Sequence, residues 1–151
     1  MKWITRERPK IDRLACPWLI KRFIDKNAEF LYVPKDQVIE LSKSMQAIPY
    51  DVPNVELTHD EPLCSFDAFL KKYQLNDEGL NKLAEIIRAA DTDTLEKSPQ
   101  AYGLLAITLG LSQNISNDHE LLKIDITIYD GLYRWCKDLT NEKHGWYPEK
   151  M

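Results

Sequence analysis

The sequence is poor in the residues that mark nucleotide sites and disulfide frameworks. Its five glycines form neither a GxGxxG pattern nor a phosphate-binding loop, so we expect no nucleotide cofactor. Three cysteines are an odd number, and no two of them have CxxC spacing. This pattern favours reduced thiols over a disulfide framework and indicates a reducing compartment.

Long apolar runs are also missing. The longest apolar stretch, residues 102–111, is far shorter than the ~20 residues that a membrane-spanning helix needs. The N-terminus has no apolar segment followed by small residues of the kind that a secretion signal requires. We therefore expect a soluble cytoplasmic protein with no membrane partner.

The length of 151 residues is typical of one domain, which we expect to span residues 1–140, with a polar tail over residues 141–151. The net charge of −4 argues against general nucleic-acid binding. Residues 1–26, however, hold eight basic and three acidic side chains, a net charge of +5, so the rest of the chain carries −9. This asymmetry indicates either an anion site or ion pairs within the molecule.

Strand signals occur only in the first half of the chain. Residues 3–5 have β propensity, and the aromatic and β-branched run at 28–33 ends at a proline. Residues 48–52 and 55–58 are weaker strand candidates on either side of a Pro-Asn turn. The pattern predicts an α+β fold, mainly α, with a small two- to three-stranded sheet from the N-terminal half.

Apolar residues at helical spacing predict a bundle of about five to six helices. The segments that we expect to be helical lie within 12–24 and 36–44 and over 66–73, 77–90, 99–111 and 117–139. Suitable N-caps for three of them are Ser65, either Asn76 or Asp77, and Asn117. Because the 99–111 segment is apolar on nearly all sides, we expect it to be the central buried helix.

A basic motif near the N-terminus is the first candidate site. Arg6, Arg8, Lys10 and Arg13 supply the forked and point-charge donors that bind tetrahedral oxyanions. The alternative is that these arginines pair with acidic helices. Cys16 follows closely; if it lies near a helix N-terminus beside Arg13, its pKa is lowered and it becomes a catalytic or redox-responsive thiolate. Otherwise it is a small buried apolar residue.

A metal centre is the second candidate site. His59 leaves a predicted strand, where it can act as a general base or a metal ligand. Asp91 lies at a helix C-terminus, where the helix dipole disfavours an acidic group, so it needs a cation or an arginine partner such as Arg8 or Arg13. With His119 and Glu120 from the last helix, these residues form a donor set that suits Mn, Fe, Ni or Zn.

The sequence resembles the ChrB-type chromate-resistance family over residues 3 to 137. The resemblance rests on the segments 3–20, 23–25, 28–34, 55–60, 64–69, 89–93 and 118–120. It implies a bacterial cytoplasmic protein that is tied to chromate resistance. Full-length members of the family carry an extra N-terminal region and regulate a resistance operon. This chain begins at the domain's own first strand, so direct DNA binding is not expected of it.

The resemblance carries no settled mechanism, and two functions stay open for the site residues. One is a binding or sensor module for an oxyanion such as chromate. The other is a metal-dependent enzyme that performs redox detoxification or hydrolysis. A third possibility is docking of a protein partner, and assembly into a homo-oligomer stays open as well.

Overall fold

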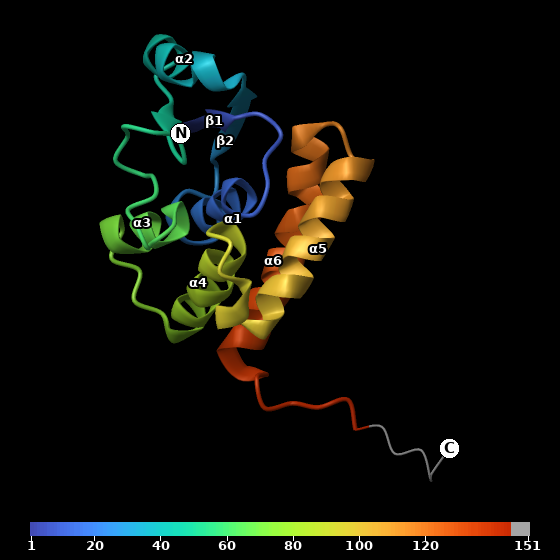
Figure 1. Ribbon diagram of the computed structural model, residues 1–151. Coiled ribbons are helices and arrows are strands. Elements are labelled where there is room, and N and C mark those ends of the chain that lie inside the picture. Colours follow the sequence, from blue (N-terminus) through green and yellow to red (C-terminus); the bar gives the residue numbers. More distant parts are fainter. Residues whose placement is uncertain (146–151) are drawn as a thin grey trace.

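The computed structural model describes residues 1–145, and within them it contains three strands and six α-helices (Figure 1). The predicted α+β, mainly helical fold is confirmed. In chain order the elements are β1 (Lys2–Arg6), α1 (Asp12–Leu19) with a π-helical extension (Ile20–Ile24), β2 (Glu29–Val33), a 3₁₀ turn (Lys35–Gln37), α2 (Val38–Ser44), β3 (Ile48–Pro49), α3 (Ser65–Lys72), α4 (Glu78–Asp91), a 3₁₀ turn (Leu95–Lys97), α5 (Pro99–Asn114) and α6 (Asp118–Asp138).

The sheet is parallel, with strand order β2-β1-β3. The central strand β1 is buried over Trp3, Ile4 and Thr5, as expected for a parallel strand that is covered on both faces. The weak strand predicted over 55–58 does not form; Leu57 makes only an isolated bridge with Tyr50. Because all strands run in one direction, the loops after β1 and β3 leave the same edge of the sheet.

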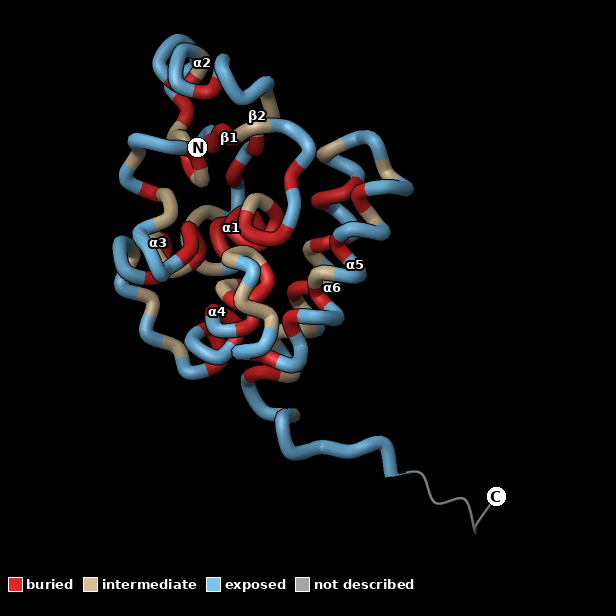
Figure 2. The backbone as a smooth tube through the Cα atoms, in the orientation of Figure 1, coloured by how far each residue is buried: buried red, intermediate tan, exposed pale blue. Residues whose placement is uncertain are grey.

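Helix α1 is almost wholly buried and lies at the centre of the molecule, where Figure 2 shows a continuous buried stretch of chain. Pro17 lies inside this helix and has no N–H to donate. The backbone continues past it into the π-helical turn, where the N–H of Ile20 donates to the carbonyls of Cys16 and Pro17. The helix therefore begins at Asp12, and Cys16 lies in its interior.

The prediction that the 99–111 segment forms the central buried helix is wrong. Helix α5 buries only four of its sixteen residues, Ala101, Leu104, Thr108 and Ser112. Helix α4 is the more central helix of the second half, because it packs against α1, α3, α5 and α6. The apolar character of α5 therefore lies partly on its outer surface. No helix within residues 1–145 is long and apolar enough to cross a membrane.

Asp125 is a fully buried carboxylate on α6, and neither of its oxygens has a hydrogen-bond partner within the described part of the chain. Burial raises the pKa of Asp125 to about 7, because removal from water disfavours the ionised form. The folded protein therefore holds this proton more tightly than the unfolded chain, in which the pKa is 3.8. Ionisation of Asp125 favours unfolding, and this effect grows as the pH rises from 3.8 to about 7.

We expect the Asp125→Asn variant to gain stability relative to the original protein as the pH rises from 4 to 8. The relative gain should be on the order of 2–4 kcal/mol, from the size of the pKa change. Urea denaturation at both pH values measures it, and Asp138→Asn, an exposed position on the same helix, is the control. Equal pH dependence of the original protein and the Asp125 variant would contradict the assignment.

Candidate functional site

Three carboxylates converge on one nitrogen of His59. The Nε2 atom lies 2.9 Å from Asp91 Oδ2, 3.1 Å from Asp51 Oδ1 and 3.3 Å from Asp12 Oδ2. The imidazole side chain is 31% exposed, whereas that of Asp12 is 0% exposed. The cluster therefore has a buried floor and one side that opens to solvent at His59.

Each carboxylate comes from the end of a different element. Asp12 is the first residue of α1, Asp91 is the last residue of α4, and Asp51 follows β3. The backbone N–H of Asp12 donates to Asp91 Oδ1 at 3.3 Å, so the end of α4 caps the start of α1. This contact also explains how an acidic group is tolerated at the C-terminus of α4, where its own helix dipole disfavours it.

Asp12 also anchors the N-terminus of α3. Its Oδ2 accepts the backbone N–H of Ser65 at 2.7 Å, and its Oδ1 accepts that of Phe66 at 3.0 Å. These two donors are among the four that the first turn of any helix leaves without partners, and they favour a negative charge. The prediction that Ser65 is the N-cap of this helix is wrong, because Ser65 is the first residue of α3 and Cys64 is the N-cap. The Ser65 hydroxyl donates to Asp51 Oδ1 at 2.7 Å instead.

The charges in the cluster attract a proton or another cation. Hydrogen bonds with Asp12, Asp51 and Asp91 raise the pKa of His59 to about 12. Burial lowers this pKa, but its effect is smaller than that of the hydrogen bonds. Burial is the largest cause that raises the pKa of Asp12, to about 7. Arg13 offsets part of the negative charge, because its Nε lies 3.3 Å from Asp51 Oδ2. Three carboxylates still face two cationic side chains when His59 is protonated.

More carboxylate oxygens surround His59 Nε2 than a single N–H group can donate to. Nε2 carries at most one hydrogen and can direct it at one oxygen, yet three carboxylate oxygens lie within 3.3 Å. Ligand atoms that share one ion at bonds of ~2.0–2.2 Å lie ~3 Å from one another, which matches these separations. Asp12, His59 and Asp91 each offer a ligand atom, and these atoms lie within 4.8 Å of one another.

Two of the four predicted metal ligands lie in this cluster and two do not. His59 and Asp91 are brought together as expected. His119 packs its ring against Tyr32 instead, with ring centroids 5.4 Å apart, and Glu120 donates its backbone N–H to Asn117 as part of the α6 cap. The predicted four-residue set therefore does not form, and Asp12 replaces the two residues of α6.

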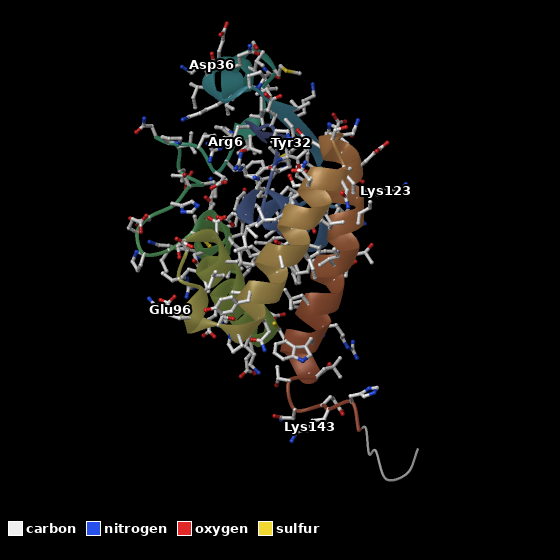
Figure 3. All side chains as sticks on the ribbon, turned by 45° about the vertical axis from the view of Figure 1, so that its right-hand side comes forward. Arg6, Tyr32, Asp36, Glu96, Lys123 and Lys143 are labelled. Atoms are coloured by element: carbon white, nitrogen blue, oxygen red, sulfur yellow. The ribbon has the colours of Figure 1, made fainter. Side chains whose placement is uncertain are left out.

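The four basic residues of the N-terminal motif do not converge on one point. Arg8 donates to the carbonyls of Ser112 and Ser116 at the end of α5. Arg13 faces Asp51, and the exposed Lys10 forms no ion pair within residues 1–145. Arg6 lines a separate hollow beside α2, and Figure 3 shows it at the same end of the molecule as Asp36.

Of the two alternatives for Cys16, the structure favours the small buried residue over the thiolate with a lowered pKa. Cys16 is fully buried in the middle of α1, and burial is the largest cause that raises its pKa, followed by the nearby Asp12 carboxylate. Its thiol donates to Asp12 Oδ1 at 3.4 Å. A protonated buried thiol is a poor nucleophile, so the structure gives Cys16 a packing role beside Asp12.

Sequence reasoning missed Asp12 and Asp51 as members of the site. Asp12 lies ahead of the buried Ala15 and Cys16, and this position puts a charge on the inner face of α1. That mismatch is a signal that the sequence did contain. Asp51 offered no such signal, since its position depends on a positive φ of 53° in an irregular loop.

Fold and site together define the class: an α+β domain with a histidine–carboxylate cluster at the carboxyl edge of a small parallel sheet. Residues 3–136 match the family described as ChrB, C-terminal domain, and the chain belongs to this family. It is 32% identical over 133 residues to Protein ChrB of Cupriavidus metallidurans. Family membership supports the association with chromate resistance.

That similarity covers 87% of this chain and 40% of the relative, so the chain spans about two fifths of the length of the curated protein that it matches. No solved structure matches the chain.

We expect Asp12→Ala to lower the free energy of unfolding by about 2–4 kcal/mol, because two buried backbone N–H groups lose their acceptor. Asp118→Ala is the matched control: this residue also begins a helix and accepts the backbone N–H of Arg8, but it is only half-buried and its hydrogen bond with Arg8 is exposed. Its loss should remove less than about 1 kcal/mol. Urea denaturation in the presence of a chelator measures both, and equal losses would show that Asp12 has no special anchoring role.

Proposed function

We propose that this chain is a metal-binding module of a chromate-resistance protein. One divalent ion would be held by Asp12, His59 and Asp91, with Asp51 beside it. The observation that carries the proposal is the convergence of three carboxylate oxygens on His59 Nε2 at 2.9–3.3 Å. Such spacing fits ligands of one ion better than acceptors that share one N–H.

The donor set points to a class of metal. Imidazole nitrogen with carboxylate oxygens suits Mn, Fe, Ni or Zn, whereas Mg and Ca favour oxygen donors alone. Thiolate ligation is not favoured, because the Cys16 thiol donates to Asp12 and is held protonated by burial. As a metal ligand, His59 would no longer be free to act as a general base.

A bound ion would join segments from three parts of the chain: the start of α1, the loop that holds His59 and the end of α4. This arrangement supports a sensory role, in which metal occupancy changes how these segments hold together. The solvent-facing side of His59 also leaves room for a substrate or water on the ion, which is the arrangement that a metal-dependent enzyme needs.

We expect protein that is purified without a His-tag and reconstituted with Mn, Fe, Ni or Zn to hold about one ion per chain. His59→Ala and Asp91→Asn should each weaken binding by at least 10-fold, because each removes one ligand. Elemental analysis and isothermal titration measure the effect, and His119→Ala is the control that keeps the cluster. A metal content well below one ion per chain after reconstitution, or equal loss in the control, would overturn the proposal.

A second candidate function is oxyanion binding at a hollow of about 340 Å³, whose lining includes Arg6 and Lys35 beside four apolar residues. Two cations border this hollow, and the buried Nε of Arg6 has no hydrogen-bond partner within the described residues. Asp36 also lines the hollow, and its negative charge weakens the attraction of an anion to this site. In this second candidate function, Arg6 and Lys35 would bind the anion in place of the whole basic motif.

We expect chromate and sulfate to bind this hollow and Arg6→Ala to abolish the binding, since the guanidinium is the main donor. Arg8→Ala should retain it, because Arg8 already binds the end of α5. Isothermal titration with both anions gives the answer. Binding that is lost with Arg8 and kept without Arg6 would contradict this location.

The acidic body of the chain disfavours contact with DNA phosphates, so we propose a small ligand instead of DNA as its partner. Free thiols at all three cysteines fit the reducing cytoplasm.

A further inference from the structure

A forked ion pair joins the end of α4 to the start of α3. Arg88 donates through Nε to Asp67 Oδ2 at 3.0 Å and through Nη2 to Asp67 Oδ1 at 2.7 Å. The Asp67 side chain is 9% exposed, and that of Arg88 is 32% exposed. Two parallel N–H···O bonds fix both the distance and the relative orientation of the groups that they join. The last turn of α4 is therefore held in a defined position against the first turn of α3.

Each partner of this ion pair lies next to a residue that belongs to the histidine–carboxylate cluster or is bound by it. Arg88 precedes Asp91 by three residues on α4, which is about one helical turn. Asp67 directly follows Phe66, whose backbone N–H donates to Asp12 at 3.0 Å. The ion pair therefore connects the helix end that carries Asp91 with the helix start that Asp12 anchors.

Three contacts form a closed ring around the cluster. Asp12 binds the start of α3, Arg88 joins the start of α3 to the end of α4, and Asp91 accepts the backbone N–H of Asp12 at 3.3 Å. The direct link between Asp91 and Asp12 is the longest of the three. Helices α1, α3 and α4 pack against one another, and Figure 1 shows α3 and α4 beside α1. The forked pair thus helps to hold Asp91 at its distance from Asp12 and His59.

Two hollows border the ion pair. Arg88 lines a hollow of about 390 Å³, and Asp67 lines another of about 440 Å³. Leu63 lines both of them, so the two hollows adjoin. Because open space lies beside both charged side chains, their geometry depends on their own hydrogen bonds more than on close packing by neighbours. A conservative change at either position therefore removes the link and leaves the surrounding core filled.

We propose that Arg88 is a positioning residue of the metal site, which acts through Asp67 to set the spacing between the ligands Asp91 and Asp12. This inference rests on the proposed function of the cluster. Arg88 does not touch the ion in this arrangement. Groups outside the ligand set that orient the ligands commonly change metal affinity by about 10- to 100-fold. The structure thus predicts that an arginine with no contact to the ion affects how tightly and in what geometry the ion is held.

Zinc affinity tests the role of the forked geometry. Arg88→Lys keeps the positive charge but cannot form two parallel hydrogen bonds, so we expect zinc binding to weaken by about 10-fold. Arg22→Lys is the matched control. Arg22 forms the same forked pair with Asp130, at 2.9 and 2.8 Å, but this pair joins the π-helical extension of α1 to α6, which supplies no ligand. Isothermal titration of both variants should show weaker binding only in Arg88→Lys.

Cobalt(II) bound in place of zinc gives a second measurement, because its visible absorption spectrum reports the coordination geometry. A loss of stability alone would leave this spectrum unchanged once the site is saturated. We expect the spectrum of saturated Arg88→Lys to differ from that of the original protein, and that of Arg22→Lys to match it. Asp67→Asn removes the same ion pair from its other end and should reproduce both effects. It decides the matter if circular dichroism shows that Arg88→Lys is unfolded.

The outcomes separate this inference from the metal site itself. An original protein that binds zinc, with an unchanged affinity and an unchanged cobalt spectrum in Arg88→Lys and Asp67→Asn, would overturn the positioning role and leave the metal site in place. Equal changes in Arg22→Lys would overturn it as well, because the effect would not depend on the link between α3 and α4. An original protein that binds neither ion would overturn the metal site and this inference together.

Discussion

The buried carboxylate of Asp12 is the interaction on which the rest of the structure depends. An ionised group that is wholly removed from water is tolerated only where donors surround it. Asp12 has two backbone N–H groups from α3, the His59 imidazole and the Cys16 thiol around it. The same contacts fix the start of α3 and complete the histidine–carboxylate cluster. Folding and the chemistry of the site therefore rest on one side chain.

Two of the residues that position this cluster have strained backbone conformations. Ile11, directly before Asp12, has a φ of 35°, which is a rare conformation for a β-branched residue. Asp51 also has a positive φ, at 53°. Such conformations persist only where the surrounding contacts hold them, and they cluster at functional sites. The Tyr129 hydroxyl donates to the Ile11 carbonyl at 3.1 Å, so α6 helps to hold the loop that leads to Asp12.

Local signals in the sequence were sufficient for most elements, whereas the site depended on contacts between distant residues. The period of apolar residues predicted the helices, and Asp77 caps α4 as expected, by accepting from Leu80. The apolar composition of α5 led to the wrong prediction that this helix is central and buried. Composition does not show whether an uncharged helix is covered by its own domain or by another surface. His59 and Asp91 were recognisable from their residue types. Asp51 was not, because an irregular loop carries it to the site.

The parallel arrangement of the sheet has a consequence for the order of events during synthesis. The central strand β1 is made first, but β3, its second neighbour, is completed only at Pro49. Asp12 is synthesised early, but its partner His59 follows later, and Asp91 is added only seventy-nine residues after Asp12. The cluster can therefore close only when most of the domain has been made. An ion that needs all of these ligands would be held only by chains whose first four helices have assembled.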